Sequence, residues 1–319
     1  MTVTHLASDS VAVTVVTCGD SAAGQLRAAG LAFDVIVWRD ILHEGPVPGG
    51  VDLDELARIR AGYLASMGWA APDAALRDFL ARDERLAAAA AGPLYLWFDD
   101  NLVNQLQLLQ ILAELAALSP NKVYLAGPRT FGGASSADLH GFFERRRPVT
   151  PEHFDAAIAG WTAFRAADPE SLNLFSGGGD WLPALGPALQ RHLRQYPSTR
   201  DGLGQTERRG LEAVAAGLTD FVDIFLAHGD GDDPPFMGDT TFRHYLERLA
   251  RGPQPLLSVD GGGGFHLTEA GARVLDGEDD QCHLNSIDRW FGGVHLTGCG
   301  QWRWDESQRQ IVSHDHRAQ

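Results

Sequence analysis

Phe33-Asp34-Val35-Ile36-Val37 runs directly into Trp38-Arg39-Asp40-Ile41-Leu42-His43-Glu44-Gly45-Pro46, and this stretch decides how the chain is organised. Its apolar, β-branched first part predicts a short buried strand over residues 33–38. An arginine, an aspartate, a histidine and a glutamate follow before a glycine–proline pair ends regular structure. Because charged side chains are rarely buried unless they are paired, this pattern indicates a functional site at the end of the strand. The alternative is an arginine–aspartate pair that braces a loop, with the histidine and the glutamate in solvent.

Three further predicted strands, over residues 11–17, 94–98 and 122–126, also end in polar or glycine-rich segments. The segments that follow them are Gly19-Asp20-Ser21, Asp99-Asp100-Asn101 and Gly127-Pro128-Arg129-Thr130. Apolar periodicity predicts helices between the strands, over residues 22–29, 52–67, 73–91 and 102–118. This alternation is typical of a parallel sheet with helices on both faces, in which ligands bind outside the carboxyl ends of the strands. We therefore expect the polar segments to meet at one edge of the sheet.

The rest of the chain is predicted to be mostly helical, with a change of character near residue 198. Three helices, a β-hairpin with a glycine-rich tip and a closing helix follow one another over residues 206–275, an order that is typical of a winged helix. The predicted fold class is α/β, with three regions. We expect a Rossmann-like parallel-sheet domain over residues 1–148, a helical linker region over 149–197, and a winged-helix-like domain with a closing β-hairpin over 198–319.

Composition limits the classes of protein to which the chain can belong. Of its 319 residues 44% are hydrophobic, which is enough for a sizeable core. The sequence has no apolar run long enough to span a membrane, and its first residues lack the basic and apolar regions of a signal peptide. Cys18, Cys282 and Cys299 are far apart, so neither a zinc ribbon nor a disulfide framework is predicted. We expect a cytoplasmic protein with no membrane partner.

The charge of the chain argues against nucleic acid as a partner. A formal net charge of −16 repels phosphate backbones overall. The expected tip of the wing, residues 260–264, contains no basic residue that could contact phosphate. The acidic loop over residues 228–233 lacks the full pattern of a calcium-binding loop, and we expect it to be solvated.

The residues after the central strand suit acid–base chemistry. His43 would act as the general acid–base, and Asp40 or Glu44 would orient its ring. These three residues are the predicted catalytic group.

An anionic substrate is predicted from the positive groups around the same edge. Arg39 would bind a phosphate or a carboxylate, together with the N–H groups of the helix that begins at Asp20 and Ser21. The alternative for Asp20 and Ser21 is that one of them caps this helix.

A divalent metal is a second route to the same chemistry. Asp99, Asp100 and His43 offer oxygen and nitrogen ligands of the kind that Mg²⁺, Mn²⁺ or Fe²⁺ accepts. The spacing matches no established metal motif, so the residue types alone support this hypothesis.

Several motifs occur together along nearly the whole chain. They are Gly19-Asp20-Ser21, Trp38-Arg39-Asp40-x-Leu42-His43-Glu44-Gly45-Pro46, Trp97-Phe98 with Gln105-Leu106, Pro197-Ser198-Thr199-Arg200-x-Gly202-Leu203, Thr206-Glu207-Arg208, Met237-Gly238-Asp239, and Arg289-Trp290-x-Gly292-Gly293-Val294-His295. In these motifs the chain resembles a bacterial family known as domain of unknown function number eighteen thirty-five. The resemblance implies no particular activity.

From these motifs Gln105, Arg200 and His295 join the predicted substrate-binding residues, His295 by reaching the site from the closing hairpin. One departure from the family bears on the chemistry. Relatives carry a Glu-His-Asp triplet after the Trp-Phe strand, whereas this chain has Asp99-Asp100-Asn101. If the triplet does chemistry in relatives, its function here is lost or changed.

Taken together, the residues favour an enzyme that acts on a small anionic substrate at the carboxyl edge of the sheet. One alternative is a ligand-binding sensor or transcription regulator with a winged helix. Another is a catalytically silent interaction protein, for which the missing histidine is the best argument. A homodimer is compatible with each of these functions.

Overall fold

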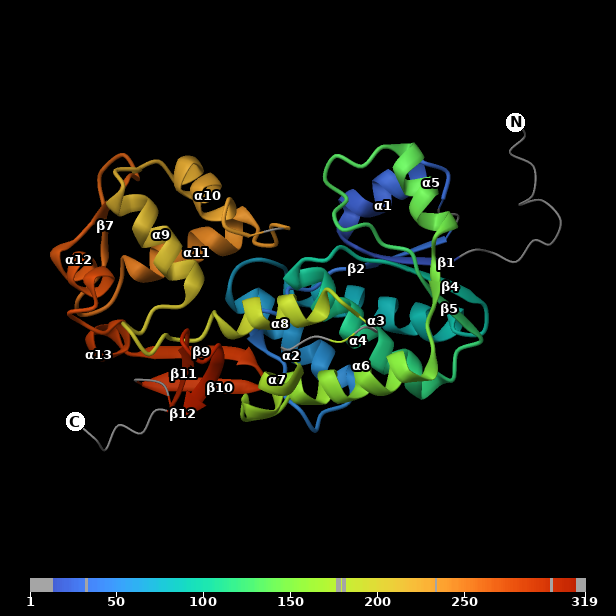
Figure 1. Cartoon of the computed structure of the whole chain (residues 1–319). Helices are drawn as coiled ribbons and strands as arrows, with labels where there is room; N and C mark the ends of the chain where they lie inside the picture. Colours follow the sequence, from blue (N-terminus) through green and yellow to red (C-terminus); the bar gives the residue numbers. More distant parts are fainter. Residues whose placement is uncertain are drawn as a thin grey trace. The chain divides into compact units, whose positions relative to one another are not determined.

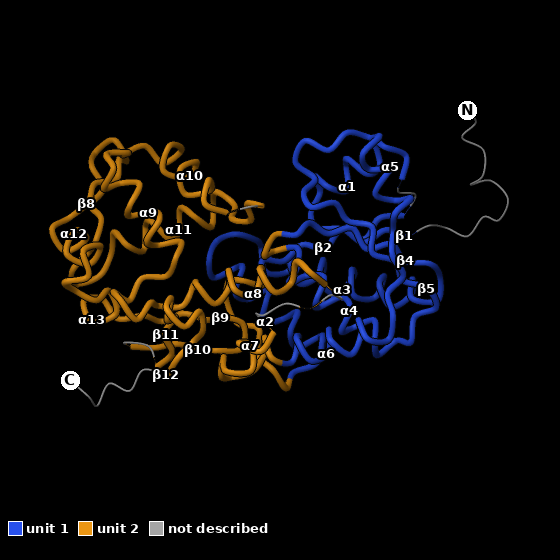
Figure 2. Tube along the Cα trace, viewed as in Figure 1, with its two compact units in different colours: residues 1–41, 51–100, 104–162 blue, residues 42–50, 101–103, 163–319 orange. Residues whose placement is uncertain are grey.

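The computed structural model describes residues 14–31, 34–175, 179, 182–232, 234–298 and 301–313. The chain forms two compact units (Figure 2). Unit 1 contains residues 1–41, 51–100 and 104–162, and unit 2 contains residues 42–50, 101–103 and 163–319. The chain therefore passes from unit 1 to unit 2 between Ile41 and Leu42, inside the motif that follows the central strand.

Unit 1 is built around a five-stranded sheet in the order β2-β1-β4-β5-β6. Its strands are β1 (Thr14–Cys18), β2 (Asp34–Trp38), β4 (Pro93–Trp97), β5 (Lys122–Leu125) and β6 (Arg147–Pro148). The first four run parallel, and β6 pairs antiparallel with β5. The expectation of an α/β chain with a largely parallel sheet is therefore confirmed.

The strand order reverses at β1, which pairs with β2 on one side and with β4 on the other. The helices accordingly lie on both faces of the sheet (Figure 1). On one face lie α1 (Gly19–Ala28) and α5 (Ser136–Glu144), and on the other lie α2 (Leu53–Ser66), α3 (Pro72–Ala89) and α4 (Leu102–Leu118). The parallel strands β1 and β4 thus end next to each other at the point of reversal, where open sheets of this type bind ligands.

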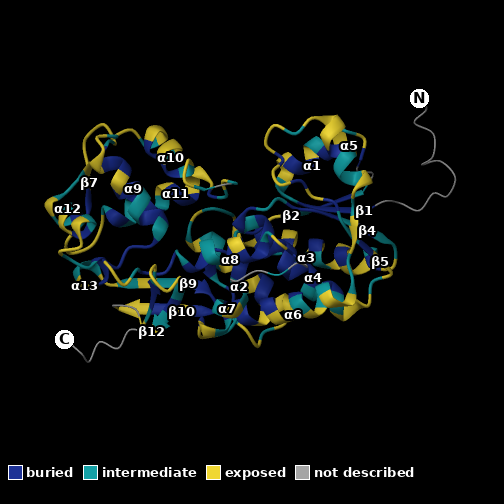
Figure 3. Cartoon of the chain, in the orientation of Figure 1, coloured by how far each residue is buried: buried dark blue, intermediate teal, exposed yellow. Residues whose placement is uncertain are grey.

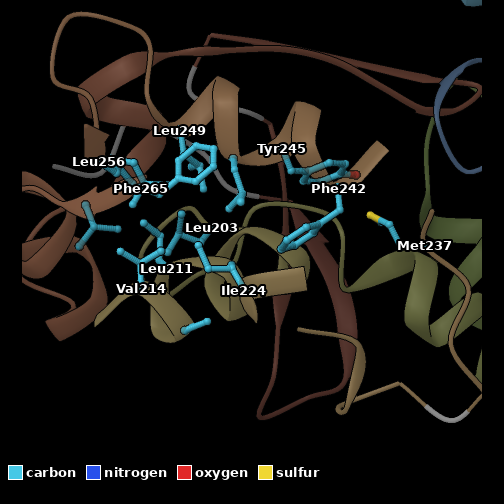
Figure 4. Close-up of a cluster of buried hydrophobic side chains, with 14 residues drawn as sticks. Leu203, Leu211, Val214, Ile224, Met237, Phe242, Tyr245, Leu249, Leu256 and Phe265 are labelled. Atoms are coloured by element: carbon cyan, nitrogen blue, oxygen red, sulfur yellow. The ribbon is translucent and has the colours of Figure 1, made fainter. Parts of the chain in front are cut away.

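Unit 2 has a separate core, which Figure 4 shows in close-up. Leu211 and Phe242 are fully buried there, on α9 and α11 respectively. The helices of this unit are α7 (Glu170–Phe175), α8 (Leu185–Leu193), α9 (Gln205–Ala215), α10 (Phe221–Gly229), α11 (Asp239–Leu249), α12 (Glu269–Asp276) and α13 (Gln281–Asn285). α6 (Pro151–Phe164) belongs to unit 1 through residue 162.

Short strands complete unit 2. β7 (Leu257–Val259) and β8 (Phe265–Leu267) form one antiparallel hairpin. β9 (Ile287–Gly292) pairs antiparallel with β10 (Val294–Gly298) and parallel with β3 (Gly45–Pro46). A further hairpin joins β11 (Trp302–Asp305) to β12 (Gln310–Ser313). The single closing hairpin expected from the sequence is therefore two separate hairpins, and Gly45-Pro46 of the central motif adds a parallel strand to the first.

Other differences from the sequence prediction concern short elements. The helices α5, α7 and α13, of five to nine residues, and the two-residue strand β6 were not expected, because such short runs carry little periodicity. Residues 163–197 belong to unit 2. Trp181 and Cys299 lie outside the described residues.

Burial follows the amphipathic pattern of the helices, as Figure 3 shows. α4 is an exception, because it is apolar or amide-rich on nearly all sides and most of its residues are buried. Within the described part of the chain, none of the helices combines the length and the apolar character needed to cross a bilayer.

The core of unit 2 gives a direct stability prediction. Leu211→Ala should lower the free energy of unfolding by about 2 to 5 kcal/mol, because it removes a fully buried side chain from a packed core. Leu226→Ala on α10 is the matched control, because Leu226 is 60% exposed and should change stability by less than about 0.5 kcal/mol. Urea unfolding followed by circular dichroism measures both. Equal effects of the two substitutions would contradict the packing described here.

Candidate functional site

A buried ion pair fixes Asp40, where the chain leaves β2. The carboxylate accepts hydrogen bonds from Arg60 Nη2 (2.7 Å), from Arg60 Nε (3.1 Å) and from the backbone N–H of Ile41 (2.8 Å). Both side chains are only 1% exposed. The backbone carbonyl of Asp40 accepts a further bond from Gln107 Nε2 on α4 (2.6 Å). Asp40 therefore anchors the strand exit to α2 and α4, and this structural role accompanies the catalytic role predicted for it.

Two more arginines of unit 1 donate hydrogen bonds to the backbone of β2 or of the residue that follows it. Arg82 is 7% exposed, donates to the backbone carbonyl of Arg39 (3.1 Å) and lies over the ring of Trp38 at 4.1 Å. Arg85 donates to the carbonyl of Val35 (3.1 Å). Arg60 and Arg82 are thus buried, although most other charged residues of their helices face solvent. The spacing of charges along a helix does not reveal that an arginine faces a buried acid on another element.

Arg39 itself forms an exposed salt bridge rather than an open anion site. Its Nη2 and Nε atoms contact the two carboxylate oxygens of Asp20 at 2.6 Å and 3.0 Å, and its Nη1 lies 3.4 Å from Asp78. The hydrogen bonds from Arg39 hold the pKa of Asp20 below its usual value. An anion at Arg39 would have to displace the Asp20 carboxylate.

The start of α1 differs from the expected cap. Cys18 occupies the N-cap position without a side-chain hydrogen bond to the helix, so neither Asp20 nor Ser21 caps it. Ser21 is exposed in the first turn. Gly19 adopts a left-handed backbone conformation with φ of +71°, which a residue with a Cβ rarely adopts. The first N–H groups of α1 are thus not satisfied by a side-chain cap.

Asp99 lies directly after β4, beside the end of β1. One of its carboxylate oxygens accepts a hydrogen bond from the backbone N–H of Phe131 (3.1 Å). Burial raises the pKa of Asp99 to about 6, the Phe131 bond offsets part of this effect, and the charge of Asp100 adds to it. The carboxyl group therefore changes its charge close to neutral pH, as an acid–base catalyst must.

Two further side chains of unit 1, those of Cys18 and Gln105, interact with Asp99. Burial, together with the charge of Asp99, raises the pKa of Cys18 to about 12, so its thiol stays protonated. Gln105 is 3% exposed and donates through Nε2 to the backbone carbonyl of Asp99 (2.7 Å). The Oε1 atom of Gln105 is buried and has no hydrogen-bond partner among the described residues. A buried acceptor of this kind calls for a donor from water or from a ligand.

A close backbone approach holds the loop after β5 against the end of β4. The backbone N–H of Asp100 donates to the carbonyl of Arg129 (3.1 Å). A Cβ at Gly127 would overlap the carbonyl oxygen of Phe98, so only glycine fits there. Burial raises the pKa of Asp100 as well, and Arg129 and Arg147 oppose this shift. Of the four polar segments predicted to meet, those after β1 and β5 belong to unit 1. So do Arg39 and Asp40 of the segment after β2, and Asp99 and Asp100 of the segment after β4.

His43 and Glu44, the other half of the central motif, belong to unit 2 and are 2% and 4% exposed. The ring of His43 packs edge-on against Phe236 at 5.3 Å. Glu44 accepts a hydrogen bond from the hydroxyl of Tyr245, which also accepts one from Arg289 (2.6 Å). Burial raises the pKa of Tyr245 above its usual value, so the hydroxyl remains a neutral donor. The alternative reading, with His43 and Glu44 in solvent, is excluded.

The same buried network continues through Glu207 on α9. Arg248 Nη2 lies 2.5 Å from its carboxylate and Arg289 Nη1 lies 3.4 Å from it. Burial alone would raise the pKa of Glu207, but Arg248 and Arg289 outweigh burial and lower it. The sequence marked Glu207 only as part of a motif, without a role.

Asp232 was expected in a solvated acidic loop, and this was wrong. Its side chain is 6% exposed and forms salt bridges with Arg191 (2.7 Å) and Arg209 (2.8 Å). Arg191 precedes His192, which is fully buried. Burial, followed by the charges of His43 and Arg191, lowers the pKa of His192 to about 3, so its ring is neutral at pH 7.

The last two predicted binding residues also lie in unit 2. His295 is exposed, lies 2.6 Å from Asp288 through Nε2 and stacks on Trp290 at 4.5 Å. It therefore forms a surface pair across the β9–β10 hairpin. Arg200 borders a pocket between α8, α9 and β11.

The metal hypothesis receives no support from the geometry. Among the described residues, no three His, Cys, Asp or Glu side chains are grouped so that they could hold an ion. Asp99 and Asp100 lie in unit 1, whereas His43 lies in unit 2.

Comparison with models of known protein families gives no match. Comparison with curated proteins gives none either. The resemblance described above therefore rests on the motifs quoted for it.

Arg60→Ala should lower the free energy of unfolding by about 3 to 5 kcal/mol, because it leaves the Asp40 carboxylate buried without its partner. Arg58→Ala is the matched control on the same helix. Arg58 is 60% exposed and lies 3.9 Å from Asp54, so its loss should change stability by less than about 0.5 kcal/mol. Chemical unfolding of both variants measures the difference. An Arg60→Ala variant as stable as Arg58→Ala would show that the pair does not hold the strand exit.

Proposed function

We propose that the chain is an enzyme that acts on a small anionic substrate, and that Asp99 is an acid–base group of its active site in unit 1. The observation that carries the proposal is a half-buried carboxyl group with a pKa raised to about 6 at the reversal point of the sheet. Perturbed carboxyl groups cluster at functional sites, and this edge is where open parallel sheets bind ligands.

The neighbours of Asp99 give each part of the proposal a chemical basis. At neutral pH the carboxylate is ionised and accepts a proton from a substrate hydroxyl or from water. The buried Oε1 of Gln105 offers an acceptor for a substrate donor. The first N–H groups of α1, which follow Cys18 without a side-chain cap, suit the phosphate or carboxylate of the substrate.

Asp99 takes over part of the role that the sequence assigned to His43. The protonated thiol of Cys18 is unsuited to attack as a nucleophile, which leaves proton transfer as the chemistry favoured by this edge. His43, Glu44 and Asp40 remain predicted catalytic residues. Arg39 remains a predicted anion ligand that would exchange its bond to Asp20 for one to the substrate.

We infer a Rossmann-like layout for unit 1 and a winged-helix-like layout for α9 to α12 with the β7–β8 hairpin. The contacts of α11 favour a structural use of the latter. Arg243 lies over the ring of Phe221 at 3.6 Å, and Arg248 is paired with Glu207. Asp260 at the tip of the hairpin pairs with His266 (2.7 Å). Since these arginines are engaged within unit 2, a transcription regulator is the less favoured alternative.

The proposal predicts that the intact protein consumes an anionic metabolite in a mixture, and that Asp99→Asn slows this by at least about a hundredfold, the usual contribution of a positioned acid–base group. Mass spectrometry before and after incubation measures the loss. The rate of the wild-type protein should fall below pH 6, because protonation of Asp99 removes the base.

Asp155→Asn is the matched control, since Asp155 is an exposed carboxylate on α6 in the same unit. It should leave the rate within about twofold of wild type. An activity that survives in Asp99→Asn with an unchanged pH profile would overturn the proposal.

A further inference from the structure

Unit 2 contains a pocket of about 320 Å³ that is separate from the sheet edge of unit 1. Its floor includes Leu203 and Trp304, which are 1% and 3% exposed. Arg194, Arg200 and Arg208 border it, together with Glu306. An apolar floor with charged groups at the rim is the usual composition of a small-molecule site, and the volume lies within the usual range.

The loop that carries Arg200 is held rigidly. Asp201 is fully buried and accepts hydrogen bonds from Ser198 Oγ (2.7 Å) and from the N–H of Leu203 (3.0 Å). Gly202 has φ of +73°, and a Cβ there would lie 2.5 Å from an oxygen of Asp280. The backbone therefore accepts only glycine at this point, and the turn that precedes Leu203 keeps one backbone conformation.

Two of the three arginines at the rim have carboxylate partners. Arg194 lies 3.3 Å from Glu306, which is 70% exposed, and Arg208 pairs with Asp201 and lies 3.8 Å from Glu212. Arg200 forms no salt bridge with any described residue, and its guanidinium group donates a hydrogen bond to the carbonyl of Leu275 (2.9 Å). Burial and the charge of Arg200 lower the pKa of Arg208, so the two guanidinium groups oppose each other. A bound anion would relieve this repulsion.

We propose that this pocket binds a small organic anion, whose apolar body lies on Leu203 and Trp304 and whose terminal phosphate or carboxylate is held by Arg200 and Arg208. Guanidinium groups are well suited to such oxyanions because their N–H groups match two oxygens at once. The proposal is independent of the chemistry proposed for Asp99, because its residues all lie in unit 2.

The test uses two probes on the intact chain, phenyl phosphate and benzoate, with phenol as the neutral control. Isothermal titration calorimetry at low ionic strength measures their affinities. At least one anion should bind at millimolar concentration or better, and phenol should not. A preference for phenyl phosphate would identify a phosphate ligand, and a preference for benzoate a carboxylate. If neither anion binds, or if phenol binds equally well, the proposal is overturned.

Arg200→Ala should weaken binding of the preferred probe by about tenfold, because it removes one charge-assisted contact. Arg200→Lys should weaken it less, since the charge is kept. Arg251→Ala is the matched control, because Arg251 follows the end of α11, is 70% exposed and lies outside the pocket. Its effect should stay below about twofold. Equal affinity in Arg200→Ala and the wild-type chain would contradict the proposal.

The indole N–H of Trp304 gives a second readout, because it donates to Glu306 at the rim (2.6 Å). Its resonance is assigned by its loss in Trp304→Phe. The preferred probe should shift this resonance in the wild-type chain. A bound probe that leaves the resonance unmoved lies elsewhere, and this result would also overturn the proposal.

Discussion

The buried ion pair between Asp40 and Arg60 is the interaction on which the carboxyl edge of unit 1 depends. Two charged side chains that are 1% exposed are tolerated only because they form an ion pair with each other, and because the N–H of Ile41 donates a further hydrogen bond to the carboxylate. The pair ties the end of β2 to α2, and Gln107 ties the same residue to α4. The strand therefore ends at a defined place within unit 1.

The two halves of the central motif lie in different units and have different roles. Asp40 serves as an anchor among the helices of unit 1, while Glu44 joins a network with Tyr245 and Arg289 in unit 2. What remains at the sheet edge of unit 1 is a carboxyl group, Asp99, that is half-buried and has no arginine at salt-bridge distance among the described residues. That difference explains the chemistry proposed for it, since a paired carboxylate such as Glu207 has its pKa lowered instead.

The sequence predicted the strands and long helices of unit 1 because their periodicity is local. It also placed the polar segments after β1, β4 and β5 at one edge, since parallel strands impose that arrangement. It failed where burial depends on contacts between distant residues. Arg60 and Asp232 look like solvated charges in the sequence, yet each is buried against a partner at least twenty positions away. The raised pKa of Asp99 likewise comes mainly from burial, which cannot be predicted from a stretch of acidic residues in the sequence.

The most direct test of the account is a pH titration of the side-chain carboxyl of Asp99 by carbon-13 nuclear magnetic resonance, with Asp99→Asn to assign the signal. We expect a midpoint near 6, because burial disfavours the ionised form. A midpoint near 4, the value of an ordinary aspartate, would show that the carboxyl is fully solvated and would contradict its assignment as the acid–base group.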